Sequence, residues 1–318
     1  MNNLKNNKDD NNILKYFNGR IVYNKITKRT IYYQDLKKKW KFYSNEEGFL
    51  LLKKCYKKIK SMLVENIDLI KKSNKDINKI LKDGYNIYKN KTSLKKKTKS
   101  YGTGEYVTWT DEEYSHLGFQ RYYLIVKGFQ RFCETWSLLE RSCNYGVLKN
   151  IPDKLNIVSI GGGPGFECYA FELFLKKYYP KKKCVFHILD LENKWGNYIK
   201  KFGNNYYFYK WDLYKDDIYK TTNLKNIHFI TISAFFVMYM TNDYSYNLIN
   251  NWLNKNVLSI FINSRAKKIE GKVHLKKKNI YTTNLLGEND DRQIVLGLKK
   301  YKKEHYLKNI FPNVPYVN

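Results

Sequence analysis

The segment "NIVSIGGGPGFECYAFELF", Asn156 to Phe174, decides the fold expected of this 318-residue chain. Its short apolar run predicts a buried strand, and the glycines that follow predict a tight turn. The apolar spacing after Phe166 predicts an amphipathic helix. A strand, a glycine-rich turn and a helix in this order are typical of sites that hold a nucleotide-like ligand.

The spacing of the glycines argues against two nucleotide sites. A dinucleotide-binding turn of the form G-x-G-x-x-G needs its third glycine at the position of Phe166, so an NAD site is disfavoured. A phosphate-binding P-loop needs Gly-Lys-Ser or Gly-Lys-Thr after the glycines, and "GPGFEC" lacks it. The glycines that remain to be explained are Gly161, Gly162, Gly163 and Gly165.

After Pro152 the chain alternates between apolar runs and amphipathic segments. Strands are predicted at 156–161, 184–190, 206–212, 227–236 and 257–264, helices at 166–179, 197–201 and 241–256, and a hairpin at 279–286 and 292–299. This alternation predicts an α/β fold with a doubly wound, mainly parallel seven-stranded sheet and an antiparallel terminal hairpin. A basic helical N-terminal region precedes it.

The G-x-G-x-G spacing after an apolar strand resembles motif I of class I, Rossmann-like, S-adenosylmethionine-dependent methyltransferases, with no subfamily identified. The resemblance covers residues from about Leu155 to Lys299. It implies S-adenosyl-L-methionine as the cofactor, lying across the carboxyl ends of the strands. Asp190 ends the second strand, 29 residues after Gly161, where the family carries an acid that accepts hydrogen bonds from both ribose hydroxyls.

Further positions match the family in order. Asp212 ends the third predicted strand, where the resemblance implies a group that accepts from the adenine N6 amine, and the fourth strand would bring Ser233 to the sulfonium. Taken singly, each acid is also explained as the cap of the turn that follows it. The implied cofactor-binding residues are Ser159, Gly161, Gly162, Gly163, Gly165, Glu167, Asp190, Leu191, Asp212, Leu213 and Ser233.

One position departs from the family. Two residues before the first glycine the family usually has an acid for the methionine ammonium, and this chain has Ser159. Glu167, just after the turn, or backbone carbonyls are the alternatives for that task. A degenerate fold that binds no cofactor is a further interpretation.

Residues beyond the fourth and fifth strands are candidates for substrate contact, and no catalytic residue is identified. The aromatic side chains Phe235, Phe236 and Tyr239 would stack a flat substrate, or else belong to the core. The polar group that leaves the fifth strand would hydrogen-bond a substrate or bind phosphate, or else form a solvated loop; its members are Asn263, Ser264 and Arg265.

The acceptor atom is left open by the motifs. The Asn/Asp-Pro-Pro-aromatic run of exocyclic-amine enzymes, the Lys-Asp-Lys-Glu set of ribose 2′-O enzymes and the nucleophilic cysteine of cytosine C5 enzymes are all missing from the expected positions. A missing general base does not argue against catalysis, because aligning a good nucleophile with a sulfonium supplies most of the rate.

The N-terminal region is predicted to be helical. Residues 45–90 have apolar spacings of three and four, and Thr110 with Glu113 forms a capping box for a helix that runs to residue 143. "GFQR" occurs at Gly118 and again at Gly128. Ten residues turn a helix by about 80° off register, so we interpret the repeat as chance.

The charge points to a polyanionic partner. Lys and Arg number 59 against 29 acids, a formal net charge of +30, and RNA is the expected partner. Drift in an AT-rich coding sequence, which enriches Lys and Asn, is the competing explanation. The odd count of 5 cysteines has no C-x-x-C pair, so neither a metal site nor a disulfide framework is expected.

The expected organisation is a disordered tail at 1–12, a basic and mainly helical region at 13–150, a methyltransferase domain at 151–300 and a C-terminal tail at 301–318. No signal peptide or membrane span is expected, and the predicted location is cytoplasmic or nuclear. The leading hypothesis is a methyltransferase acting on RNA. The alternatives are a protein or small-molecule methyltransferase and an inert nucleic-acid-binding protein; the oligomeric state is left open.

Overall fold

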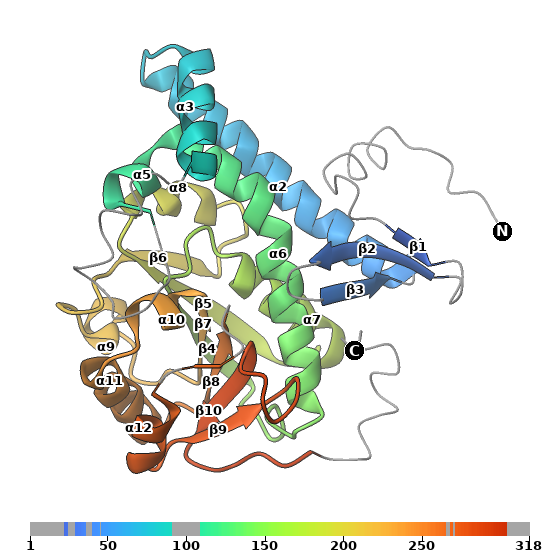
Figure 1. Ribbon diagram of the computed structural model, residues 1–318, viewed down its shortest axis with the longest axis vertical. Helices are drawn as coiled ribbons and strands as arrows, with labels where there is room; N and C mark the ends of the chain where they lie inside the picture. The colour runs from blue at the N-terminus through green and yellow to red at the C-terminus, as the bar shows by residue number, and fades with distance from the viewer. Residues whose placement is uncertain are drawn as a thin grey trace.

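The computed structural model describes residues 22–24, 29–35, 40–44, 46–90, 109–264, 268–269 and 271–303. They form a large sheet with helices on both faces, a helical extension beside it and a small separate sheet (Figure 1). Arg265, the tail expected at 1–12 and residues 304–318 of the tail expected at 301–318 lie outside the described residues.

The large sheet has seven strands, and its topology confirms the predicted fold. Its strands are β4 (Lys154–Ile160), β5 (Lys183–Asp190), β6 (Tyr206–Lys210), β7 (Phe229–Ser233), β8 (Ser259–Asn263), β9 (Tyr281–Asn284) and β10 (Gln293–Gly297). The order is β6-β5-β4-β7-β8-β10-β9. The strands β4 to β8 pair in parallel, and β10 pairs antiparallel with β8 and β9. This is the doubly wound order with one antiparallel strand inserted before the edge.

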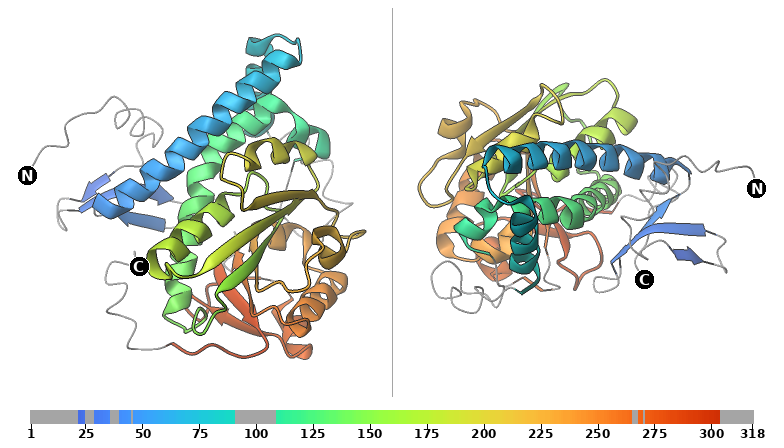
Figure 2. Two further views of the ribbon diagram at one scale, coloured as in Figure 1. Left: turned by 180° about the vertical axis from the view of Figure 1, so that it is seen from behind. Right: turned by 90° about the horizontal axis from the view of Figure 1, so that it is seen from above.

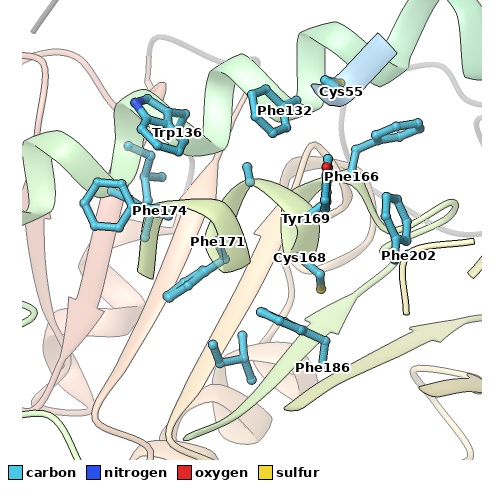
Figure 3. Packing of buried hydrophobic residues seen from close by; sticks show 14 of the residues in the cluster. Cys55, Phe132, Trp136, Phe166, Cys168, Tyr169, Phe171, Phe174, Phe186 and Phe202 are labelled. Atoms are coloured by element: carbon cyan, nitrogen blue, oxygen red, sulfur yellow. The ribbon is translucent and has the colours of Figure 1, made fainter. Parts of the chain in front are cut away.

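Each face of the sheet has its own apolar core beneath helices. On one face α7 (Phe166–Tyr178) lies between the strands and α6 (Leu117–Cys143), and Phe132 and Trp136 of α6 pack towards it (Figure 3). On the other face α11 (Asp243–Asn254) buries Ile249 and Trp252. The shorter helices are η1 (Asn193–Trp195) and α8 (Gly196–Ile199) on the α7 side, and α9 (Ile218–Thr222), α10 (Phe235–Tyr239) and α12 (Lys272–Lys277) on the α11 side.

The fourth strand of this sheet is shorter than predicted. A strand was expected over 227–236, but β7 ends at Ser233 and Phe235 begins α10. The cause is Ala234, whose φ of 27° and ψ of −24° turn the chain out of the extended conformation. The apolar run Phe235–Val237 therefore belongs to a helix, although its composition suits a strand.

The helix predicted to start at Thr110 begins with the expected capping box but breaks after one turn. The Thr110 hydroxyl accepts from the Glu113 N–H at 3.2 Å, and the Glu113 carboxylate accepts from the Thr110 N–H at 2.8 Å. This short helix is α5 (Asp111–Ser115). His116 is extended, and its ring Nδ1 accepts from the Phe119 N–H at 3.3 Å, so a second cap opens α6.

Two glycines of α6 mark its crossings with the helices α2 (Glu46–Lys72) and α3 (Ile77–Asn90). A Cβ on Gly118 would lie 1.9 Å from the Ile80 carbonyl oxygen of α3. A Cβ on Gly128 would lie 2.8 Å from Ile59 of α2. Figure 2 shows the long helices α2 and α6 side by side. The two copies of "GFQR" therefore place their glycines against different helices, and the interpretation of the repeat as chance is not tested by these contacts.

A small antiparallel sheet near the N-terminus was not predicted. It contains β1 (Val22–Asn24), β2 (Arg29–Asp35) and β3 (Trp40–Ser44), with β2 in the middle. Within the ranges that the structure describes, no helix is both long and apolar enough to cross a membrane. In the same ranges, no group of three or more His, Cys, Asp or Glu side chains is arranged to hold a metal ion.

Candidate active site

Three predicted site segments leave the sheet at the same level. Ile160 of β4 pairs with Leu189 of β5 on one side and with Ile232 of β7 on the other. Gly161, Asp190 and Ser233 follow these three residues directly. The chain winds to β5 and β6 on one side of β4 and then returns to β7 on the other, so this edge is the topological switch point, where open α/β sheets bind ligands.

The glycine-rich turn requires glycine for conformation and for space. Gly161, Gly163 and Gly165 have φ values of 59°, 50° and 81°, which residues with a Cβ adopt at a cost. A Cβ on Gly161 would also lie 2.3 Å from the Phe235 ring. The Gly165 N–H donates to the Gly162 carbonyl at 2.9 Å and closes the turn just before α7.

Asp190 is joined to the turn by its carboxylate. Oδ2 accepts from the Gly163 N–H at 2.9 Å, and Oδ1 accepts from the Glu192 N–H at 3.0 Å. Burial raises the pKa of Asp190 to about 6, against the opposing effect of the Glu192 and Gly163 N–H groups. Each carboxylate oxygen has two lone pairs, so each keeps one for a further donor.

Asp212 stands at the neighbouring strand end and caps a turn. Its Oδ1 accepts from the Tyr214 N–H at 2.9 Å, and its Oδ2 lies 3.6 Å from Lys215 Nζ. The Trp211 N–H donates to the Asp190 carbonyl at 3.0 Å, which ties the two strand ends together. The side chain of Leu213 is buried in the core, whereas Leu191 beside Asp190 is 43% exposed.

Ser159 and Glu167 have different surroundings, although both were considered for the same task. Ser159 is buried, and a Cβ on Gly162 would lie 2.5 Å from its hydroxyl. The hydroxyl also hydrogen-bonds the Cys168 thiol, so Ser159 supports the turn from within the core. Glu167 is buried in the first turn of α7, with its Oε1 3.8 Å from Nε of Arg131.

Arg131 brings α6 into the site. Its Nη1 donates to Glu134 Oε2 at 3.1 Å, so one guanidinium faces two buried carboxylates. Gln130 also donates to Glu134, at 2.7 Å. Burial raises the pKa of Glu167, and the charge of Arg131 opposes this effect. Arg131 therefore lies between the buried carboxylates of Glu134 and Glu167.

The polar residues at the ends of β7 and β8 differ in their surroundings. Asn263 is held inside the protein: its Oδ1 accepts from Gln293 at 2.9 Å, and its Nδ2 donates to Thr135 at 3.3 Å. Ser264 is buried, and its N–H donates to the Arg292 carbonyl at 2.8 Å. The buried hydroxyl of Ser233 lies beside the Glu167 carboxylate and opposes the rise in its pKa.

The three aromatic candidates differ in burial. Phe236 is completely buried in the core under α11, so it is not available to a substrate. Phe235 and Tyr239 are half-buried, with ring centroids 4.7 Å apart. The structure therefore leaves two of the three aromatic candidates, Phe235 and Tyr239, accessible at this edge.

Arg131 and Tyr214 were missed by sequence reasoning. Arg131 lies 36 positions before Glu167, and only the packing of α6 on α7 brings the two together. Tyr214 was passed over because nothing local separates it from the other 29 of the 30 tyrosines. The one sequence feature that includes Arg131 is the second "GFQR", which we interpreted as a chance repeat.

Comparisons with known proteins give only distant structural similarity. No protein-family model and no curated protein matches the chain. The citrinin polyketide synthase CMeT domain aligns over 59% of this chain and 54% of its own, at 11% identity and a TM-score of 0.37. The plantazolicin methyltransferase BpumL in complex with SAH aligns over 65% and 61%, at 14% identity and a TM-score of 0.33.

A third solved structure, M. capricolum TrmK in complex with S-adenosyl-homocysteine, aligns over 52% of this chain and 72% of its own, at 18% identity and a TM-score of 0.31. The chain thus spans 54% and 61% of the length of the first two structures, less than two thirds of each. At these TM-scores no residue correspondence follows. The fold assignment rests on the strand order and the terminal hairpin of the chain itself.

Proposed function

We propose that this protein is an S-adenosylmethionine-dependent methyltransferase. The observation that carries the proposal is Asp190 at the switch point, hydrogen-bonded to the glycine-rich turn with one lone pair left on each oxygen. Two vicinal ribose hydroxyls fit this acceptor. The bound cofactor would supply an electrophilic methyl group on a sulfonium.

The remaining residues of the site also suit this cofactor. The carboxylate of Glu167 in the first turn of α7 suits an ammonium group, and the N-terminus of α7 with Arg131 suits a carboxylate. Exposed Leu191 offers apolar surface to an adenine ring. The buried Ser233 hydroxyl, beside the Glu167 carboxylate, places a polar group at the end of β7 where the sulfonium is expected.

For the acceptor we propose RNA, on the strength of the formal net charge of +30. Drift in an AT-rich coding sequence explains the same charge by its enrichment in Lys and Asn, which keeps a small-molecule substrate as the second candidate. We propose a cytoplasmic or nuclear location for the protein with either substrate.

Calorimetric titration with S-adenosylmethionine tests the cofactor assignment. We expect the wild type to bind, Asp190→Ala to lose affinity at least tenfold, a loss of about 1.4 kcal/mol or more, and Asp153→Ala to bind as wild type. Asp153 is an exposed carboxylate at the opposite edge of the sheet, before β4, which makes it a matched control. Equal affinities of the wild type and Asp190→Ala would refute the assignment.

Transfer of a radiolabelled methyl group onto fractionated cell extract tests the acceptor. Label that nuclease releases supports RNA, and label that protease releases supports protein. Label in the small-molecule fraction supports the second candidate.

A further inference from the structure

Four aromatic side chains from three separate segments meet at the carboxyl edge of the sheet. They are Phe235 and Tyr239 of α10, Tyr214 from the turn after β6, and Tyr244 at the start of α11. We call this set the aromatic surface. Only Phe235 and Tyr239 were among the candidate substrate residues.

The aromatic surface consists of two ring pairs joined by one hydrogen bond, and it begins at the glycine-rich turn. The Phe235 ring lies against Gly161, so close that a Cβ there would be 2.3 Å from it. Phe235 and Tyr239 have ring centroids 4.7 Å apart. The Tyr214 hydroxyl donates to the Tyr239 carbonyl at 3.1 Å, and the Tyr214 and Tyr244 rings are 5.4 Å apart.

The core accounts for only two of these rings, because Phe235 and Tyr239 pack against the cluster under α11 and Tyr214 and Tyr244 belong to neither core. Tyr214 and Tyr244 are 37% and 42% exposed, and Phe235 and Tyr239 are half-buried. The backbone that presents them is strained, because Ala234 starts α10 with a φ of 27°. A non-glycine residue in this conformation has an energetic cost, and such strain is common at functional sites.

The charges around the aromatic surface favour the bases of a nucleic acid over its phosphates. The turn that carries Tyr214 has three carboxylates, Asp212, Asp216 and Asp217, against one lysine, Lys215, which lies 3.6 Å from Asp212. The exposed Asp243 lies next to Tyr244 and 3.4 Å from His274. Carboxylates repel phosphate, while an uncharged base stacks on tyrosine and phenylalanine regardless of its sequence. The surface therefore fits bases, with the phosphates directed away from it.

We propose that the aromatic surface stacks unpaired bases of an RNA and delivers one of them to the methyl-transfer site beside Gly161. This inference rests on the proposed function, since it names the part of the RNA that enters the same site. Tyr244 is the outermost ring and makes a ring contact with Tyr214. A substitution at Tyr244 should therefore change base stacking without changing the packing of the fold.

The test measures the affinity of the full chain for a single-stranded oligoribonucleotide of mixed sequence and for the same oligomer with abasic positions. Variants are Tyr244→Ala, Tyr244→Phe and Tyr281→Ala, the last a control tyrosine that is exposed on β9 at the far edge of the sheet. We expect Tyr244→Ala to weaken binding of the base-containing RNA about tenfold. Tyr244→Phe and Tyr281→Ala should bind as wild type, and the abasic oligomer should not distinguish the variants.

Equal affinity of wild type for the two oligomers, unchanged RNA affinity in Tyr244→Ala, or no RNA binding at all would overturn the inference. Calorimetry with S-adenosylmethionine on the same samples keeps the two proposals apart. Cofactor binding without base-dependent RNA binding overturns the aromatic surface alone. Absence of cofactor binding by the wild type refutes the proposed function instead.

Discussion

At the scale of single residues, Asp190 combines a structural and a binding role in one carboxylate. It accepts the Gly163 and Glu192 N–H groups, and burial raises its pKa to about 6. In the ligand-free protein, the ionised form is thus disfavoured relative to the unfolded chain. The contribution of Asp190 to stability therefore declines as pH rises from its ordinary carboxyl range to about 6.

Cofactor binding should depend on pH in the opposite direction. Ribose hydroxyls donate to the ionised carboxylate, so affinity should be constant above about pH 6 and fall as pH drops below it. Binding near pH 6 should release protons, which calorimetry in buffers of different ionisation enthalpy measures. Asp190→Asn should show weak affinity without this pH dependence, and a flat wild-type profile would contradict the assignment.

Gly161 should tolerate no side chain. Gly161→Ala adds a Cβ at a φ of 59° and 2.3 Å from the Phe235 ring, and should lower the free energy of unfolding by about 2 kcal/mol or more. Gly163→Ala is the matched control, because Gly163 has a similar φ of 50° but a Cβ there would meet no atom nearer than 4.0 Å. Chemical denaturation of the two variants separates the steric part from the conformational part. Equal losses would show that contact with Phe235 is unimportant.

At the scale of elements, the crossing of α3 and α6 depends on two glycines in direct backbone contact. A Cβ on Gly84 would lie 1.9 Å from the carbonyl carbon of Gly118. Overpacking against backbone should outweigh the better helix propensity of alanine. Gly84→Ala should therefore destabilise the protein by about 2 kcal/mol, measured by chemical denaturation, while Asn86→Ala on the exposed side of α3 should be neutral or stabilising. A stable Gly84→Ala protein would mean that the two helices cross at a greater distance.

At the scale of the whole molecule, the predicted domain boundary near residue 150 runs through a shared core. Side chains of α2 and α6, including Ile59, Phe132 and Trp136, belong to the same cluster as α7 and the strands. A fragment of residues 151–303 would expose the outer face of α7 to water. We expect it to be insoluble or to unfold without cooperativity in circular dichroism, and residues 46–303 to unfold cooperatively. A cooperative transition of the shorter fragment would support the boundary.

The sequence predicted those parts of the fold that depend on local pattern. Apolar runs identified the parallel strands, and the glycine spacing with Asp190 at a strand end located the switch point. Arg131 was not predicted as a site residue, because packing between helices distant in the sequence brings it to Glu167. Periodicity along the chain does not encode such packing. The start of a helix at Phe235 was not predicted, because the strained backbone conformation of one residue, Ala234, overrides the strand-like composition.

The repeated "GFQR" has a consequence for how the chain can vary in length. Gly118 and Gly128 hold two crossings of α6 that are about 15 Å apart along its axis. Inserting or deleting one residue between them would rotate one crossing by about 100° relative to the other and turn its glycine away from the partner helix. In a library of single-residue insertions, we therefore expect surface turns to accept an insertion and the stretch of α6 between Gly118 and Gly128 to accept none.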